Sequence, residues 1–339
     1  MPRVSLAPQF VGGGQIHFKP REVPDPGVGQ LLVKVRANAI CGSDRDMFYN
    51  GSATTPGHEA AGEVAAVGAK TSTELGTRGA IYFKDFCGMC RSCRLGFTSQ
   101  CLHKRQDLGF NADGGYGPFE LVHETNFFPI SDDVSFVEAT MLLDAMGTTG
   151  HAIRRAELLR TDIESIYIAG AGPIGLGLLA MAKIRYGESI PIYIGDVSSW
   201  RAELAESMGG LLVKPGSPDI RGGQVDVSFD TTGRAVARQA ALEYLGSRGV
   251  FVCVGGSEGL VLKDVGSELL RLERSILGSE YFDFSEMPGN LDLLRDNRAL
   301  IGKLVTHVDD ISELQHAFEL FLSGMTGKVV VTQTEQPLE

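Results

Sequence analysis

The feature that most constrains the fold is the regular alternation of apolar runs and helical segments in the second half of the chain. Short apolar runs of strand length recur at residues 165–170, 190–196, 225–230, 249–256 and 273–280. Segments with a helical pattern separate several of them, at residues 175–185, 201–209 and 235–245. Strands that alternate with helices predict a parallel, doubly wound sheet and therefore an α/β domain.

The rest of the chain is predicted to form a β-rich domain. Residues 1–150 contain short alternating runs, such as residues 31–40, which Gly and Pro interrupt. The tail contains a strand that leads into a helix and then a final strand at residues 328–333. We assign this tail to the first domain. The predicted domains are therefore residues 1–150 with 288–339, and residues 151–287.

Gly170, Gly172 and Gly175 form the pattern G-x-G-x-x-G between an apolar run and a helical segment. In this context the glycines let the backbone approach a pyrophosphate, which the helix N-terminus binds through free N–H groups. Pro173 and Ile174 fill the pattern and belong to the same predicted dinucleotide-binding loop. The alternative is a glycine-rich turn that binds no ligand.

An acidic residue at the end of the next predicted strand favours the dinucleotide interpretation. Asp196 lies where a carboxylate accepts hydrogen bonds from the adenosine ribose. Its negative charge would repel a 2′-phosphate, so NAD is predicted as the cofactor in preference to NADP. Arg201 follows closely and either flanks the ribose or covers the surface.

Four cysteines lie close together in the first domain with the spacing C-x2-C-x2-C-x7-C: Cys87, Cys90, Cys93 and Cys101. Four thiolates at such spacing can surround one zinc ion tetrahedrally. Disulfides are the alternative, but a cluster of this kind in a chain of 339 residues is more typical of metal binding. A closed site of four thiolates leaves no position for a substrate, which predicts a structural zinc.

A second set of potential ligands lies upstream of this cluster. Cys41 is followed by His58 and Glu59, which stand in the pattern G-H-E-x2-G-x5-G. One thiolate, one imidazole and one carboxylate form a plausible catalytic zinc site with a position open for water or substrate. Cys253 stands alone in an apolar run and is predicted to be a buried strand residue.

Composition excludes several classes of function. The formal net charge of −11 argues against nucleic acid and against an anionic membrane as partners. The N-terminus has no apolar run typical of a signal peptide, and no segment has the length and hydrophobicity of a membrane span. A cytoplasmic location is expected, and unpaired thiolates agree with it.

Together these motifs resemble the zinc-dependent medium-chain alcohol dehydrogenases over nearly the whole chain. The resemblance rests on CGSD at 41–44, GHE at 57–59, the four cysteines, GAGPIG at 170–175 and Asp196. It implies a GroES-like catalytic domain and a Rossmann domain, with the active site in the cleft between them. It also implies one catalytic and one structural zinc ion, and a homodimer or homotetramer.

The resemblance assigns further residues to the site. Asp144 occupies the position of an additional zinc ligand just before the Rossmann domain, although a turn or cap role is the alternative. Ser43 matches the hydroxyl that relays the proton, and Thr148 matches a residue that touches the nicotinamide. Asp44 matches a residue that orients His58. Many relatives have a His where this chain has Asp46, so either this carboxylate or water is expected to end the proton relay.

The expected reaction is the reversible transfer of a hydride between a small alcohol and NAD, which gives a ketone or an aldehyde. Asp144 and the GHE motif resemble the polyol, threonine and secondary-alcohol branches of this family. This resemblance implies secondary alcohols, polyols or amino alcohols as substrates. Two alternatives stay open at this point: a zinc-free quinone or enoyl reductase of the same fold, and a non-catalytic NAD-binding protein.

Overall fold

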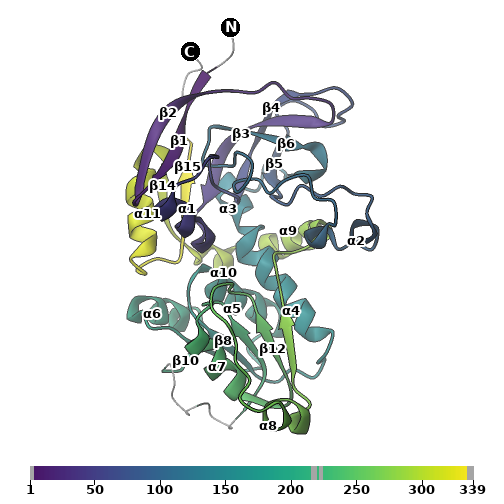
Figure 1. Ribbon diagram of the computed structural model, residues 1–339, viewed down its shortest axis with the longest axis vertical. Helices are drawn as coiled ribbons and strands as arrows, with labels where there is room; N and C mark the ends of the chain where they lie inside the picture. The colour runs from purple at the N-terminus through teal and green to yellow at the C-terminus, as the bar shows by residue number, and fades with distance from the viewer. Residues whose placement is uncertain (1–3, 215–219, 221–223, 334–339) are drawn as a thin grey trace.

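A computed structural model describes residues 4–214, 220 and 224–333 of the chain. The two ends of the predicted first domain, residues 1–3 and 334–339, lie outside this description. So do residues 215–219 and 221–223 of the predicted second domain. Figure 1 shows two domains, one above the other, joined by helices α4 (Thr149–Glu157) and α9 (Met287–Asp296).

The upper domain is built on a seven-stranded sheet in the order β14-β15-β3-β4-β5-β7, with β6 also paired to β3. Its central strand β3 (Gln30–Ala39) is almost entirely buried. The other strands are β4 (Ala60–Val67), β5 (Arg78–Ile81), β6 (Phe119–His123), β7 (Phe127–Pro129), β14 (Val305–Asp310) and β15 (Lys328–Thr332). Because β15 pairs with β3 in antiparallel register, the C-terminal tail is part of this sheet.

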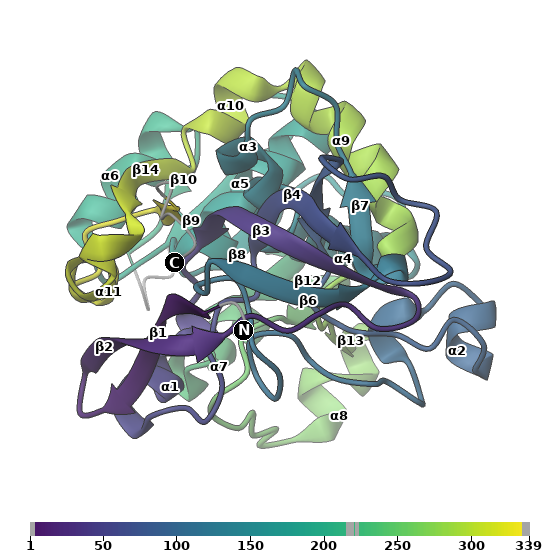
Figure 2. The same ribbon diagram turned by 90° about the horizontal axis from the view of Figure 1, so that it is seen from above.

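Smaller elements surround this sheet. β1 (Val4–Gly12) and β2 (Gln15–Glu22) form a separate antiparallel hairpin, and α11 (Leu314–Leu322) packs beside β15. A loop that carries the short helix α2 (Arg91–Arg94) projects on the side opposite the hairpin (Figure 2). We call residues 87–101, which include the four cysteines, the cysteine lobe.

The lower domain contains a six-stranded, wholly parallel sheet in the order β10-β9-β8-β11-β12-β13. Its strands are β8 (Ile166–Ala169), β9 (Ile192–Gly195), β10 (Leu211–Leu212), β11 (Val225–Asp230), β12 (Leu245–Cys253) and β13 (Ser275–Gly278). Helices α5 (Pro173–Tyr186), α6 (Ser199–Ser207) and α7 (Ala235–Glu243) connect them. The order reverses direction between β8 and β11, and ligands bind at the carboxyl ends of strands beside such a switch point.

The predicted combination of a β-rich domain and a doubly wound parallel sheet is confirmed. From the sequence alone, the pattern directly after Pro288 is irregular and predicts no helix, yet α9 and α10 (Arg298–Gly302) occupy this region. Pro288 stands in the first turn of α9, where its missing N–H removes no helical hydrogen bond. None of the helices in the described ranges is long and apolar enough to cross a membrane.

Candidate active site and metal centres

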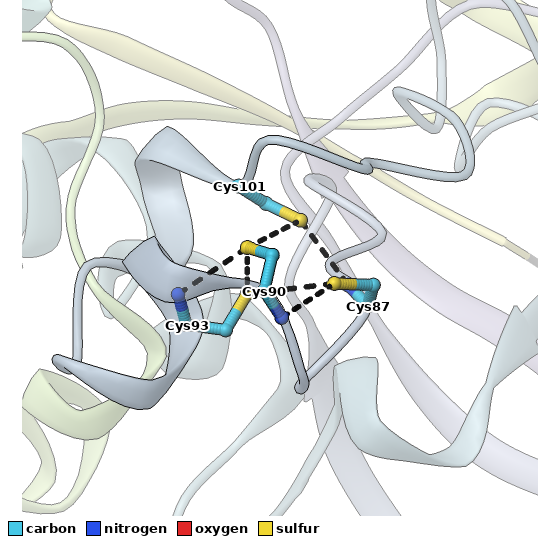
Figure 3. Close-up of side chains that lie close together, drawn as sticks. All are labelled: Cys87, Cys90, Cys93 and Cys101. Carbon is cyan, nitrogen blue, oxygen red and sulfur yellow. Dashed lines mark hydrogen bonds between the residues drawn. The ribbon is translucent and has the colours of Figure 1, made fainter.

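The cysteine lobe brings its four thiols together, as Figure 3 shows. The Sγ atoms of Cys90 and Cys93 lie 3.5 Å apart, those of Cys90 and Cys101 3.9 Å, and those of Cys87 and Cys93 4.0 Å. All four cysteines are free of disulfides. Four sulfurs bonded to one tetrahedral zinc lie about 3.8 Å from one another, so these three separations are close to those of a zinc site.

Backbone N–H groups point at these sulfurs and favour the thiolate form. Cys90 Sγ accepts hydrogen bonds from the N–H groups of Cys93 and Leu102, at 3.5 and 3.4 Å. The backbone hydrogen bond from Cys93 is the main reason that the pKa of Cys90 falls to about 6. Thiolate is the metal-binding form of cysteine, so Cys90 is electrostatically prepared for a cation. Burial instead raises the pKa of Cys93 to about 12.

The second predicted ligand set also converges. Cys41 follows β3, His58 and Glu59 precede β4, and Asp144 opens a π-helical turn at Asp144–Thr148. One potential ligand atom from each of these residues lies within 4.8 Å of the others. Cys41 Sγ is 3.1 Å from Asp144 Oδ2, which is 3.5 Å from His58 Nε2. Cys41, His58 and one of the two carboxylates, Glu59 or Asp144, would suit a zinc ion that retains one open position.

Asp44 lies beside Nδ1 of His58 and orients its imidazole ring. Its Oδ1 lies 3.3 Å from His58 Nδ1, and its Oδ2 accepts hydrogen bonds from Tyr116 (2.7 Å) and from the N–H of Cys41 (3.2 Å). A carboxylate on Nδ1 fixes the tautomer and leaves Nε2 free to face the cluster. Tyr116 was not identified from the sequence, because a lone tyrosine 72 residues from Asp44 carries no local signal.

Lys328 is another residue that was not identified from the sequence. It is only 1% exposed, and its ammonium forms an ion pair with Glu59 Oε1, which is wholly buried. The second carboxylate oxygen, Glu59 Oε2, has no hydrogen-bond partner among the described residues. Glu59 therefore has one oxygen committed to Lys328 and one available at the cluster. The sequence feature that could have identified Lys328 is the position of a lysine at the start of the apolar strand β15.

The charges of the cluster perturb one another. Burial raises the pKa of the Cys41 thiol, and the negative charge of Asp144 adds to this effect. Burial alone would lower the pKa of His58, but Asp44 and Cys41 raise it well above its ordinary value. Burial alone would raise the pKa of Asp144, yet its hydrogen bond to His58 holds that pKa well below the ordinary value. This set of buried acidic groups attracts positive charge, which is what a metal ion supplies.

The three residues assigned to catalysis lie at different distances from the cluster. Thr148 donates a hydrogen bond to Asp144 Oδ1 at 3.3 Å, and Ser43 Oγ lies 3.5 Å from His58 Nε2. Asp46 is exposed on the first turn of α1 (Arg45–Asn50). Within the described residues, no hydrogen bond joins Asp46 to Ser43 or to His58.

The glycine pattern forms the turn between β8 and α5. Gly170 has a φ of +94°, and a Cβ on Gly175 would lie 1.8 Å from the carbonyl oxygen of Gly170. Both positions therefore require glycine to shape the turn. A Cβ on Gly172 would meet nothing closer than Arg201 at 3.7 Å, so this glycine leaves open space at the N-terminus of α5. Pro173 and Ile174 form the first turn of that helix.

Asp196 directly follows β9 and lies beside this turn. Its Oδ2 accepts a hydrogen bond from the N–H of Ala171 at 2.6 Å, and its Oδ1 accepts one from the N–H of Ser198 at 2.8 Å. Arg201 donates from Nε to the carbonyl oxygen of Thr326 at 3.0 Å. The glycine turn, the acidic residue and the arginine are thus brought together, as a dinucleotide site requires.

A cavity of about 590 Å³ lies at the carboxyl ends of β12 and β13. Cys253, the last residue of β12, lines it and is half-buried, so it is the predicted strand residue but is less buried than predicted. His151 also lines it and lies close to Asp283 and Glu286, as a third group of potential ligands. Arg154 already pairs with Glu286 there, so this group is better explained as an ion-pair network.

Two protein-family models match the chain. The alcohol dehydrogenase GroES-like domain matches residues 27–132, and the zinc-binding dehydrogenase domain matches residues 173–296. The first match confirms that the β-rich domain is GroES-like. The second begins at Pro173, within the glycine pattern, and covers the strands of the parallel sheet from β9 to β13.

Individual proteins are similar over almost the full length. The uncharacterized zinc-type alcohol dehydrogenase-like protein YphC of Escherichia coli strain K12 is 28% identical, over 97% of this chain and 99% of its own. L-Threonine 3-dehydrogenase of Shewanella pealeana is 29% identical, over 91% and 94%. The structure of acetophenone reductase from Geotrichum candidum, in complex with NAD, matches with a TM-score of 0.86 at 25% identity and 98% coverage of both chains.

The cysteine lobe generates a direct test. We expect Cys93→Ser to lower the zinc content by about one ion per chain and to reduce the melting temperature, because three thiolates hold the metal less tightly than four. Metal analysis and thermal unfolding of the purified variant measure both effects. Cys253→Ser is the matched control and should retain the native zinc content. Unchanged zinc in Cys93→Ser would contradict the assignment.

Proposed function

The chain belongs to the zinc-dependent medium-chain alcohol dehydrogenase family, and from this premise we propose that it oxidises secondary alcohols, polyols or amino alcohols with NAD and zinc. The chain belongs to this family and is similar to known dehydrogenases over almost its full length, so it is an alcohol oxidoreductase that acts on a small molecule. The choice of NAD, the two zinc ions and the class of alcohol are our proposals.

The observation that carries the proposal is the convergence of Cys41, His58 and Asp144 beside the carboxyl ends of a dinucleotide-type sheet. Bound at these residues, zinc would act as a Lewis acid that lowers the pKa of the substrate hydroxyl. A zinc-free reductase has no need for this buried set of donors. A non-catalytic NAD-binding protein would need neither the donors nor the hydroxyl of Ser43 beside them.

The residues of the chain have separate tasks in this reaction. Asp44 fixes the ring of His58, and Ser43 Oγ, beside Nε2 of that ring, is placed to accept the proton from the substrate hydroxyl. Ser43 is exposed, so the proton can pass from it to water. Asp46 can take part only through such water, because it is exposed on α1 and makes no hydrogen bond with Ser43 in the described chain. Thr148 donates a hydrogen bond to Asp144 and, in this proposal, touches the nicotinamide ring.

The preference for NAD rests on Asp196. Its carboxylate lies at the glycine turn, where it would accept hydrogen bonds from the ribose hydroxyls and repel a 2′-phosphate. Arg201 contacts the catalytic domain through Thr326 and lies near Gly172, so it can flank the same ribose. Nicotinamide dinucleotides supply the hydride acceptor in this chemistry.

We expect Asp144→Ala to reduce turnover by about a hundredfold or more, because the loss of one ligand weakens the stabilisation of the substrate alkoxide. NAD binding should persist, since the glycine turn lies in the other domain. Initial rates of NAD reduction with a panel of secondary alcohols and polyols, together with NAD titration calorimetry, measure the two effects. Asp132→Ala changes an exposed aspartate and serves as the control. Full activity of Asp144→Ala would show that this carboxylate is not an essential ligand.

The cofactor assignment is tested separately with Asp196→Ala. A hydrogen bond to a charged group contributes about 1.5–3 kcal/mol, which corresponds to a tenfold to hundredfold loss of NAD affinity. The ratio of kcat/KM with NAD to kcat/KM with NADP should therefore fall in the variant. If the native protein prefers NADP, or if the variant's ratio does not move, Asp196 does not select the cofactor.

A further inference from the structure

The segment after β13, residues 279–284, runs from the carboxyl end of the parallel sheet to the wall of the catalytic cluster. The ring of Phe282 packs on Gly147, where an added Cβ would lie 2.4 Å from it. Gly147 belongs to the turn that begins with Asp144. Tyr82 donates a hydrogen bond to the carbonyl oxygen of Phe282, which fixes the segment from the other side. The residue before Phe282 is therefore held firmly next to the site.

That residue, Tyr281, has a strained backbone. Its φ is +55°, in the left-handed region that a bulky aromatic residue seldom adopts, although the residue is only 5% exposed. Its ring packs on Phe83 with a centroid distance of 4.3 Å, and the ring of Phe83 lies 5.4 Å from that of His58. Strain of this kind persists where surrounding contacts impose it, and it concentrates at functional sites.

The backbone N–H of Phe83 lies near the buried hydroxyl oxygen of Tyr281 and lowers its pKa. The hydroxyl itself donates to no hydrogen-bond partner among the described residues. Buried tyrosine hydroxyls normally have one. Tyr82, whose ring centroid lies 5.0 Å away, has two: Thr98 and the carbonyl oxygen of Phe282. Burial raises the pKa of Tyr281 well above its ordinary value, and the negative charge of Asp144 is the next largest cause. The hydroxyl is thus within electrostatic reach of a candidate metal ligand.

We propose that Tyr281 is a specificity-determining residue whose hydroxyl donates a hydrogen bond to a second oxygen of the substrate, on a carbon near the reacting one. This inference rests on the proposed function and narrows its substrate class to diols, polyols and hydroxy ketones. The aromatic rings of Phe83 and Phe110 pack against His58 and make the wall otherwise apolar. An apolar wall binds different alcohols with similar affinity. A buried hydroxyl discriminates more strongly, because a substrate without a second oxygen leaves this hydroxyl without a hydrogen bond and therefore binds less tightly.

The test compares 2,3-butanediol with 2-butanol in the native protein and in Tyr281→Phe. Calorimetry on the zinc-loaded protein with NADH measures alcohol binding without turnover, and NAD reduction gives kcat/KM for each alcohol. We expect the diol to bind more tightly than the monol in the native protein. In Tyr281→Phe, affinity and kcat/KM for the diol should fall about tenfold, while those for the monol should change less than twofold.

The melting temperature shows whether the hydroxyl of Tyr281 has a structural role, because the loss of a stabilising hydrogen bond would lower it. Tyr281→Phe should retain the native melting temperature, because the hydroxyl donates to no partner in the part of the chain that the structure describes, whereas Tyr82→Phe should lower it and leave the ratio of diol to monol unchanged. Equal losses for both alcohols, no loss for either, or a lowered melting temperature in Tyr281→Phe would overturn the proposal. Absence of NAD reduction by any alcohol in the native protein would instead contradict the proposed function, since the binding preference is measured independently.

Discussion

The structure depends on the balance of charge in one buried cluster. Asp44, Glu59 and Asp144 are each at most 6% exposed and lie around Cys41, and the nearby cationic groups are His58 and Lys328. Buried charges must be paired, because an uncompensated one costs several kcal/mol. Lys328 balances Glu59, and Asp44 holds His58. A divalent cation between Cys41, His58 and Asp144 would complete the balance, so the same electrostatic requirement explains both the stability of this core and its expected chemistry.

Segments that are distant in sequence meet around this cluster. The C-terminal tail returns to the first sheet as β15, and the first residue of that strand is Lys328, which reaches the cluster. From the other domain, the segment after β13 reaches the cysteine lobe: Asp283 Oδ1 accepts hydrogen bonds from the N–H and the hydroxyl of Ser99, both at 3.0 Å. This segment therefore connects the end of the parallel sheet to the cysteine lobe and to the turn that carries Asp144. A metal in the lobe would stiffen this support at a distance from the reacting atoms.

The sequence predicted those parts whose chemistry is local. The four cysteines, the glycine turn and Asp196 each follow from a short motif with a stereochemical reason, and the alternation of strands and helices predicted the parallel sheet. Lys328, Tyr116 and Tyr281 were missed because their partners lie far away in sequence; Lys328 and Glu59 are 269 residues apart. Only the folded sheet brings β15 beside β3. The helix at Met287 was missed because the pattern after Pro288 is irregular.

The most direct test of this account is anomalous diffraction at the zinc absorption edge from crystals of the zinc-loaded protein. The account predicts two anomalous peaks per chain, one among Cys87, Cys90, Cys93 and Cys101, and one among Cys41, His58 and Asp144. A peak in the cysteine lobe alone, with Cys41 and Asp144 still in direct contact, would contradict a catalytic zinc and with it the central claim about the buried cluster.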